Sequence, residues 1–330
     1  MLELHSPTAF PETLRNGVLC IGNFDGVHRG HAQMLAAGRA AAAKSQIPFT
    51  IMTFHPHPAH ILKPDTPRHP LTTLAQRKSL LAQFNPDVLL IIPPTREFLS
   101  ITAQDFLQNT VRINPQTNTG IGASLLVEGP TFTFGRGAKG TIRTLEQLGP
   151  TLGFQTQIIP AFETPLSNLT LVKVSSSLIR WLIEHGRVAD AARCLGRPYS
   201  VTGTVIEGQK RGRTLGIPTA NLQTKTDTDP GQLLPAPGIY AGRAKFANQS
   251  HLAAISVGDN PTFPGTPFSV EAHLLDFSAD LYGQTITVEF NHWLRDMLPY
   301  AGPAPLVTQI QRDIAQTRQF ATALSIVHNS

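Results

Sequence analysis

Two histidines stand three residues apart in the stretch 21–31, Ile-Gly-Asn-Phe-Asp-Gly-Val-His-Arg-Gly-His. A short apolar run precedes this stretch, and an alanine-rich segment that favours a helix follows it. The glycines let a ligand approach the backbone closely, and the start of the helix offers free N–H groups. His28 and His31 can then hold one anionic group and stabilise charge that builds on it during a displacement reaction. The pattern predicts a phosphate site; the alternatives are metal binding and a chance pair on a turn.

A second group of polar residues lies in the stretch 212–222, Gly-Arg-Thr-Leu-Gly-Ile-Pro-Thr-Ala-Asn-Leu. Thr219 and Asn221 alternate, so their side chains face the same side of an extended segment. A hydroxyl and an amide carbonyl are hard oxygen ligands, which suit Mg²⁺ that bridges phosphates. The segment 269–277 also alternates and carries Glu271 on its polar face. A carboxylate there can take a proton from an attacking alcohol, although alternation alone favours a solvated strand residue.

Three more histidines occur in the stretch 54–60, Phe-His-Pro-His-Pro-Ala-His. Such a cluster can suggest zinc. The interleaved prolines, however, predict an extended loop at the end of a strand, and no cysteine lies nearby. We therefore expect the edge of a substrate site here and not a metal centre.

The elements that must position the first group alternate between strand and helix. Strands are expected at 18–21, 49–54, 87–92, 124–127 and 155–159, and helices at 32–44, 73–84, 102–111 and 141–148. This alternation predicts an α/β domain with a parallel, doubly wound sheet. In such sheets the ligand binds at the carboxyl ends of the strands, near the point where the strand order reverses.

The pattern changes after residues 196–198, Gly-Arg-Pro. Strand candidates separated by turn residues follow at 199–206, 238–246, 252–257, 269–277 and 284–290, and a helix closes the chain from about residue 304. This pattern predicts an antiparallel barrel or sandwich. We place the domain boundary after residue 186, which gives domains of residues 1–186 and 187–330.

Composition narrows the classes of partner. The chain has 330 residues, of which 41% are hydrophobic, and this is enough for two cores. Its net charge of +5 suits an anionic small ligand but is too weak to predict nucleic-acid binding. No apolar run is long enough for a membrane helix, and the N-terminus lacks the pattern of a secretory signal. Cys20 and Cys194 form neither a metal spacing nor a disulfide framework. We therefore expect a cytoplasmic protein with no membrane partner; the sequence leaves the oligomeric state open.

The stretch 22–31 resembles the signature of the nucleotidyltransferase superfamily and, over its full length, the prokaryotic bifunctional riboflavin kinase/FMN adenylyltransferases (FAD synthetases). The segments 53–58 and 174–180 are similar to the same family. In the C-terminal half, the segments that look like the riboflavin kinase module are 218–221, 238–240, 258–263, 271–276, 281–283 and 292–296. The resemblance covers about residues 15–322.

This resemblance implies a Rossmann-like nucleotidyltransferase domain followed by an antiparallel β-barrel riboflavin kinase domain with a C-terminal helix. It implies ATP-dependent phosphorylation of riboflavin to FMN, then adenylylation of FMN to FAD with release of pyrophosphate. ATP would be the co-substrate and Mg²⁺ the cofactor. It also favours Glu271 as the catalytic base over the reading as a solvated strand residue.

The resemblance further assigns roles to individual residues. His28, His31 and Arg180 would stabilise the transition state of adenylyl transfer, and Thr219 and Asn221 would handle the metal. The residues implied in nucleotide binding are Gly22, Asn23, Phe24, Asp25, Gly30, Ser176, Ser177, Gly203, Gly208, Gly212 and Gly216. Those implied in flavin binding are Phe54, Thr131, Phe132, Asn221 and Arg295.

The sequence departs from the family pattern at two positions. Thr131 stands where the family usually has an acid or amide, in a loop that reads one residue longer, and Met297 replaces a glutamate. We expect a changed FMN orientation at the first position and altered affinity at the second. Two alternatives remain at this point: a riboflavin kinase without adenylyl transfer, and a flavin sensor or carrier that does not consume ATP.

Overall fold

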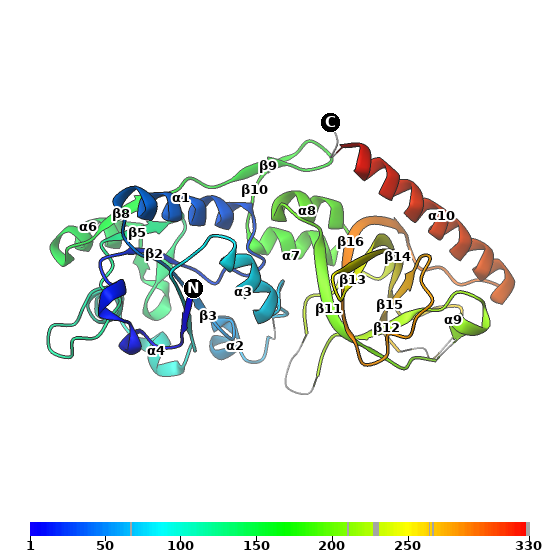
Figure 1. The fold of residues 1–330 in the computed structure, drawn as a ribbon, viewed down its shortest axis with the longest axis horizontal. Coiled ribbons are helices and arrows are strands. Elements are labelled where there is room, and N and C mark those ends of the chain that lie inside the picture. The colour runs from blue at the N-terminus through cyan, green and yellow to red at the C-terminus, as the bar shows by residue number, and fades with distance from the viewer. Residues whose placement is uncertain (67, 210, 227–230, 264, 266, 328–330) are drawn as a thin grey trace. The chain divides into compact units, whose positions relative to one another are not determined.

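The computed structural model describes residues 1–66, 68–209, 211–226, 231–263, 265 and 267–327. The chain forms two compact units, and Figure 1 labels most of their elements. The first unit contains Met1–Arg68 and Leu74–Glu163. The second contains His69–Thr73 and Thr164–Ser330.

The first unit is built on a six-stranded sheet in which every strand pair is parallel. Its strands stand in the order β1-β4-β3-β2-β5-β8. The order reverses between β2 and β5, which is where a ligand is expected in a doubly wound sheet. The prediction of a parallel sheet is confirmed, although β1 was not expected. The strands are β1 (Leu2–Leu4), β2 (Val18–Ile21), β3 (Phe49–Phe54), β4 (Val88–Ile92), β5 (Leu125–Glu128) and β8 (Gln155–Ile158).

Helices and two hydrophobic clusters cover this sheet. The α-helices are α1 (Arg29–Ser45), α2 (Pro58–Leu62), α3 (Leu74–Ala82), α4 (Arg96–Ser100), α5 (Ala103–Phe106) and α6 (Ile142–Leu152). Shorter helical turns are η1 (Pro7–Ala9), η2 (Glu12–Leu14), η3 (Leu107–Val111) and η4 (Arg136–Ala138), and β6 (Thr133–Phe134) pairs with β7 (Gly140–Thr141). β2 and β4 are buried along their whole length, as expected for parallel strands covered on both faces.

The expected extended loop over residues 54–60 was wrong in its last part. Helix α2 begins at Pro58, because the fixed φ of proline suits the first helical position. The side chain of His57 caps the helix by accepting a hydrogen bond from the Ala59 N–H over 3.1 Å. The local capping interaction therefore outweighs the tendency of a proline-rich segment to stay extended.

The second unit contains a closed six-stranded antiparallel barrel in the order β11-β12-β15-β14-β13-β16. This confirms the expected barrel. Its strands are β11 (Tyr199–Ile206), β12 (Ala220–Gln223), β13 (Gly238–Phe246), β14 (Gln249–Gly258), β15 (Ser269–Leu274) and β16 (Thr285–Arg295). The helices of this unit are α7 (Ser176–Glu184), α8 (Val188–Leu195), α9 (Arg211–Thr214) and α10 (Pro303–Val327). A two-stranded ribbon, β9 (Glu163–Pro165) with β10 (Leu171–Lys173), precedes them.

Alternating side chains fill the barrel. Tyr240 and Phe290 are fully buried and meet edge to face with ring centroids 5.2 Å apart. Helix α10 packs against β13 and β14, and α8 packs against β16. Strand β16 runs five residues beyond the predicted end at 290, and this extension carries Trp293 and Arg295 to the rim of the barrel. No helix in the described part of the chain is long and apolar enough to cross a membrane.

Candidate active sites

The turn that follows β2 has an unusual backbone. Phe24 and Val27 adopt left-handed φ angles of 47° and 38°, and Gly26 lies at 83°. A β-branched residue such as valine is rarely found there, so the turn is strained. The side chains of Phe24 and Val27 are buried in one of the two hydrophobic clusters of this unit. Core packing therefore holds a turn that the local sequence alone would not favour.

Polar groups from two other elements fix the same turn. The backbone oxygen of Asn23 accepts a hydrogen bond from Nη1 of Arg77 over 2.9 Å and one from the Thr53 hydroxyl over 3.2 Å. Arg77 comes from α3 and is only 5% exposed. Burial lowers the pKa of Arg77, while the nearby Asp25 opposes that shift. The buried guanidinium of Arg77 thus helps to fix the position of the Asn23 carbonyl.

The two histidines of the turn lie against each other at the start of α1. Nδ1 of His28 accepts a hydrogen bond from the His31 N–H over 3.2 Å, and the two rings stack with centroids 3.6 Å apart. A side chain at Gly30 would meet the His28 ring, because its Cβ would lie 3.2 Å from Cε1. This close packing explains the glycine between the histidines.

The ring of His31 is suited to bind a polar group of a ligand. Burial lowers its pKa well below the ordinary value, and the neighbouring His28 lowers it further, so the ring is neutral at neutral pH. Its Nδ1 is buried and has no hydrogen-bond partner among the residues that the structure describes. Buried polar atoms are normally paired. At a helix start, next to free N–H groups, an anion such as a phosphate is the natural partner.

Glu128 lies beside β2 at the point where the strand order reverses, on the neighbouring strand β5. It ends β5, is 1% exposed, and its Oε1 accepts a hydrogen bond from the Ile21 N–H at the end of β2 over 2.8 Å. Burial raises the pKa of Glu128 well above its ordinary value, although the bond from Ile21 opposes this. A buried carboxyl group with a raised pKa therefore links the ends of the two central strands.

We expect Glu128→Gln to stabilise the protein increasingly as the pH rises. The folded state keeps the Glu128 proton while the unfolded chain loses it above about pH 4.5, so folding must take up a proton. Gln needs no proton uptake on folding, and its amide oxygen still accepts the hydrogen bond from the Ile21 N–H. Denaturant titrations across pH 5 to 8 would measure the difference in unfolding free energy. A difference that stays constant with pH would contradict a raised pKa for Glu128.

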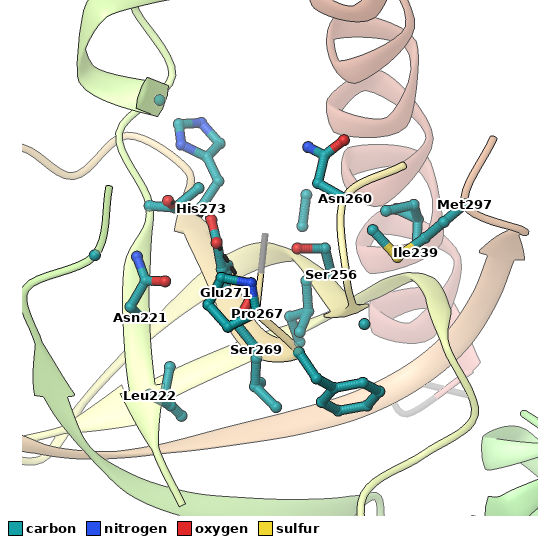
Figure 2. A pocket seen from close by; sticks show the side chains of 18 of the residues that line it. Asn221, Leu222, Ile239, Ser256, Asn260, Pro267, Ser269, Glu271, His273 and Met297 are labelled. Carbon is teal, nitrogen blue, oxygen red and sulfur yellow. Dashed lines mark hydrogen bonds between the residues drawn. The ribbon is translucent and has the colours of Figure 1, made fainter. Parts of the chain in front are cut away.

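In the barrel, two hydroxyl groups hold the carboxylate of Glu271 (Figure 2). Thr219 donates to Oε2 over 2.9 Å, and Ser269 donates to Oε1 over 3.2 Å. Asn221 on β12 stands directly opposite Glu271 on β15 in the strand register. The Thr219 hydroxyl donates its hydrogen bond to Glu271, so the lone pairs of its oxygen can accept a hydrogen bond or coordinate a cation.

These residues face a cavity of about 830 Å³, a size typical of small-molecule sites. Strands β12, β14 and β15 form one wall, and Met297, Tyr300 and Leu306 contribute to another. Arg295 also lines the cavity, and Asp313 of α10 binds its guanidinium through two hydrogen bonds of 2.9 and 2.7 Å. This ion pair fixes the end of β16 against α10.

Two glycines allow the loop before β12 to pass close to these polar residues. A Cβ at Gly208 would lie 2.4 Å from Nδ2 of Asn221, and a Cβ at Gly212 would lie 2.4 Å from the Ile217 oxygen. Neither position has room for a side chain. The backbone at Gly208 therefore lies close to Asn221, and the backbone at Gly212 lies close to that of Ile217. The oxygens of Thr219 and Asn221 suit a hard divalent cation.

Comparisons with known proteins give two family models that match successive parts of the chain. A family model described as FAD synthetase matches residues 10–177, and one described as riboflavin kinase matches residues 195–321. The bifunctional riboflavin kinase/FMN adenylyltransferase of Bacillus subtilis is 31% identical over 94% of this chain and 94% of its own length. The enzyme of that name from Escherichia coli K12 is 32% identical over 92% of each chain. The chain belongs to the bifunctional riboflavin kinase/FMN adenylyltransferase family.

A solved structure shares the fold over nearly the whole chain. The crystal structure described as a macrolide-efflux protein from Streptococcus pneumoniae has a TM-score of 0.80 and 30% identity. The match covers 96% of this chain and 99% of that one. The resemblance noted from the two motif sets is thus confirmed: this family member carries a riboflavin kinase domain and an FAD synthetase domain.

In the first unit, the structure brings together most of the residues implied by the family motif. Those in the turn after β2 are Gly22, Asn23, Phe24, Asp25 and His28, and Gly30 and His31 follow in the first turn of α1. Phe54 and Phe132 belong to one aromatic cluster, in which Phe98, Phe106 and Phe134 connect them through ring contacts of 5.5 to 6.1 Å. Thr131 is exposed on the turn after β5.

The segment 174–180 lies in the second unit and leads into α7. Ser175 caps the helix by accepting from the Leu178 N–H, and Ser176 and Ser177 are its first helical residues. Arg180 is 7% exposed, and its Nη1 lies 3.4 Å from the Ser176 oxygen, to which it donates.

In the second unit, the cavity collects the main residues implied for the kinase: Gly208, Gly212, Thr219, Asn221, Glu271 and Arg295. Met297 lines it as well. Gly203 and Gly216 are not among the described lining residues. Gly203 faces the neighbouring strand instead, since its Cβ would lie 2.7 Å from the Gln223 oxygen.

Sequence reasoning missed three residues that hold these sites. Ser269 precedes Glu271 by two positions, so strand alternation could have identified it as a neighbour on the same face. Arg77 and Glu128 carried no such signal. Their partners, Asn23 and Ile21, are distant in sequence and meet them only through the sheet.

Proposed function

We propose that this chain converts riboflavin to FMN in the barrel and FMN to FAD at the turn after β2, with one ATP consumed in each step. The observation that carries the kinase step is the cavity in which Thr219 and Ser269 orient the carboxylate of Glu271. The observation that carries the second step is the stacked pair His28 and His31 at a helix start. The FAD synthetase match supports both activities over the kinase alone.

In the kinase step, the terminal alcohol oxygen of riboflavin forms a bond to the γ-phosphorus of ATP, and ADP leaves. Glu271 takes the alcohol proton. Thr219 and Asn221 are the proposed ligands of Mg²⁺, which would neutralise charge on the phosphates. The loop backbone at Gly208 and Gly212 would bring the nucleotide close to these groups.

In the adenylyl transfer, a phosphate oxygen of FMN attacks the α-phosphorus of ATP, and pyrophosphate leaves. His28, His31 and Arg180 are proposed to stabilise the charge that develops on the phosphate oxygens. Ser176 and Ser177 would bind the triphosphate, and Phe54, Thr131 and Phe132 would contact the flavin. For this step we propose a domain of residues 1–186, which includes α7, and for the kinase residues 187–330.

Arg295 is proposed to orient the flavin in the kinase cavity, with Asp313 fixing its guanidinium. Gly22, Asn23, Phe24, Asp25 and Gly30 would bind ATP in the first unit, and the glycines at 203, 208, 212 and 216 would do so in the second. We place the protein in the cytoplasm, where both substrates and ATP are available. Its two cysteines are buried and do not form a disulfide with each other, which suits a reducing compartment.

A product time course tests this proposal directly. Purified protein with riboflavin, ATP and Mg²⁺ should form FMN first and FAD later, as resolved by chromatography. Two molecules of ATP should be consumed for each FAD. FMN without FAD would reject the second activity, and neither product over a range of metals and pH would reject the enzyme proposal altogether.

A further inference from the structure

Residues 69–73, here called the strap, belong to the second unit although the chain on both sides of them belongs to the first. In sequence the strap lies between α2 and α3, inside the range that matches the FAD synthetase model. The family model therefore assigns the strap to the FAD synthetase part of the chain, whereas the fold places it in the unit that contains the kinase barrel.

Hydrogen bonds join the strap to the segment that returns from β12 to β13. The Leu233 N–H donates to the Pro70 oxygen over 2.9 Å, and Nδ1 of His69 lies 3.3 Å from the Gly231 oxygen. A carbonyl oxygen can only accept, so Nδ1 of His69 must carry the proton. The strap and residues 231–233 thus hold each other in place.

The amide of Gln232 anchors the strap to the barrel. Gln232 is 3% exposed, and its Nε2 donates to the Leu71 oxygen over 3.1 Å and to the Ser200 oxygen over 3.0 Å. Its Oε1 accepts from the Thr202 N–H over 2.9 Å. Leu71 itself is 1% exposed. Both the N–H groups and the oxygen of this buried amide are hydrogen-bonded. Gln232 therefore fixes the strap to β11 of the barrel.

The anchored strap also reaches the cavity that contains Glu271. This part of the cavity wall is formed by His69, Thr224, Lys225, Gln232 and Leu233. Residues 224 and 225 directly follow β12, the strand that carries Asn221. His69 is exposed to the cavity, unlike Leu71 behind it. The strap therefore supplies a polar ring to the wall of the cavity that Glu271 also lines.

We propose that His69 is a substrate-binding residue of the kinase and that the strap completes the kinase site; this rests on the kinase function proposed above. In the tautomer that carries its proton on Nδ1, bound to the Gly231 oxygen, Nε2 is a hydrogen-bond acceptor. An acceptor binds an N–H group and not a phosphate oxygen. Its partner is an N–H group on the ring system of one of the two substrates: the exocyclic amino group of adenine or the imide N–H of the flavin.

Steady-state kinetics of the full-length chain tests this proposal. Initial rates of FMN plus FAD formation from riboflavin would be measured with ATP and riboflavin varied in turn. His69→Ala should raise KM for the substrate that binds Nε2 by about two- to ten-fold, the usual effect of one neutral hydrogen bond. A rise for ATP identifies adenine, and a rise for riboflavin identifies the flavin. His185→Ala, an exposed histidine of the same unit outside this cavity, should leave both KM values unchanged.

Two further measurements separate binding from folding and packing. FAD formation from supplied FMN should stay at the wild-type rate in His69→Ala. His69→Phe keeps an aromatic wall but lacks the acceptor, and it should raise the same KM. Unchanged KM values for both substrates in His69→Ala, or a normal KM in His69→Phe, would overturn the proposal. If the wild-type chain forms no FMN, the kinase function itself fails, which is a different outcome.

Discussion

Glu271→Gln should reduce FMN formation from riboflavin by about 10²–10⁴-fold, the usual effect of losing a general base. The ribityl alcohol is hardly acidic at neutral pH, so it needs a group that accepts its proton. Gln has the size of Glu, but it cannot take that proton. The hydroxyls of Thr219 and Ser269, which donate to Glu271 over 2.9 and 3.2 Å, can rotate to suit an amide. Folding should therefore survive.

Glu289→Gln provides a matched control for this substitution. Glu289 lies on β16 of the same barrel, pairs with Lys245 at 2.6 Å, and is not among the described residues that line the cavity. FMN formation should stay near the wild-type rate in this variant. Both variants should still convert supplied FMN to FAD. Phosphorylation of riboflavin by Glu271→Gln within a few-fold of wild type would remove Glu271 from the role of base.

His31→Ala should reduce FAD formation from FMN by about 10²–10³-fold while FMN formation from riboflavin continues. The buried Nδ1 of His31 has no partner in the described part of the chain, so we expect it to serve a bound phosphate. The kinase residues lie in a separate compact unit and should not be affected. Product analysis with riboflavin and with FMN as starting flavin measures the two steps separately.

His28 requires a more careful substitution because it also caps α1. His28→Ala would remove both the ring and the acceptor for the His31 N–H, and the lost cap costs about 0.5–2 kcal/mol of stability. His28→Asn keeps a good capping acceptor and removes the imidazole. It should fold normally and lose FAD formation, whereas His5→Ala, an exposed histidine of the same unit, should have no effect. Wild-type FAD synthesis in both His28→Asn and His31→Ala would reject the phosphate role.

Short-range patterns predicted the parts of both sites that are local in sequence. The run of glycines and histidines after a buried strand predicted the junction of β2 and α1, because strand, turn and helix start are contiguous there. Strand alternation placed Thr219 and Asn221 on one face and Glu271 on the polar face of another strand. It did not reveal that β12 pairs with β15, the pairing that puts Asn221 opposite Glu271.

Long-range contacts could not be predicted, because nothing in the local sequence encodes them. Arg77 reads as an ordinary charged residue of a helix, yet it is buried against the Asn23 carbonyl. The strap reads as a loop of the first domain, and only the fold shows Gln232 binding its backbone.

The most direct test of two separate sites in one chain combines the two inactive variants. Glu271→Gln alone should leave riboflavin unchanged, and His31→Ala alone should stop at FMN. An equimolar mixture should form FAD from riboflavin, because the second variant supplies FMN and the first adenylylates it. A mixture that forms no FAD, or a single variant that loses both activities while it remains folded, would contradict the account.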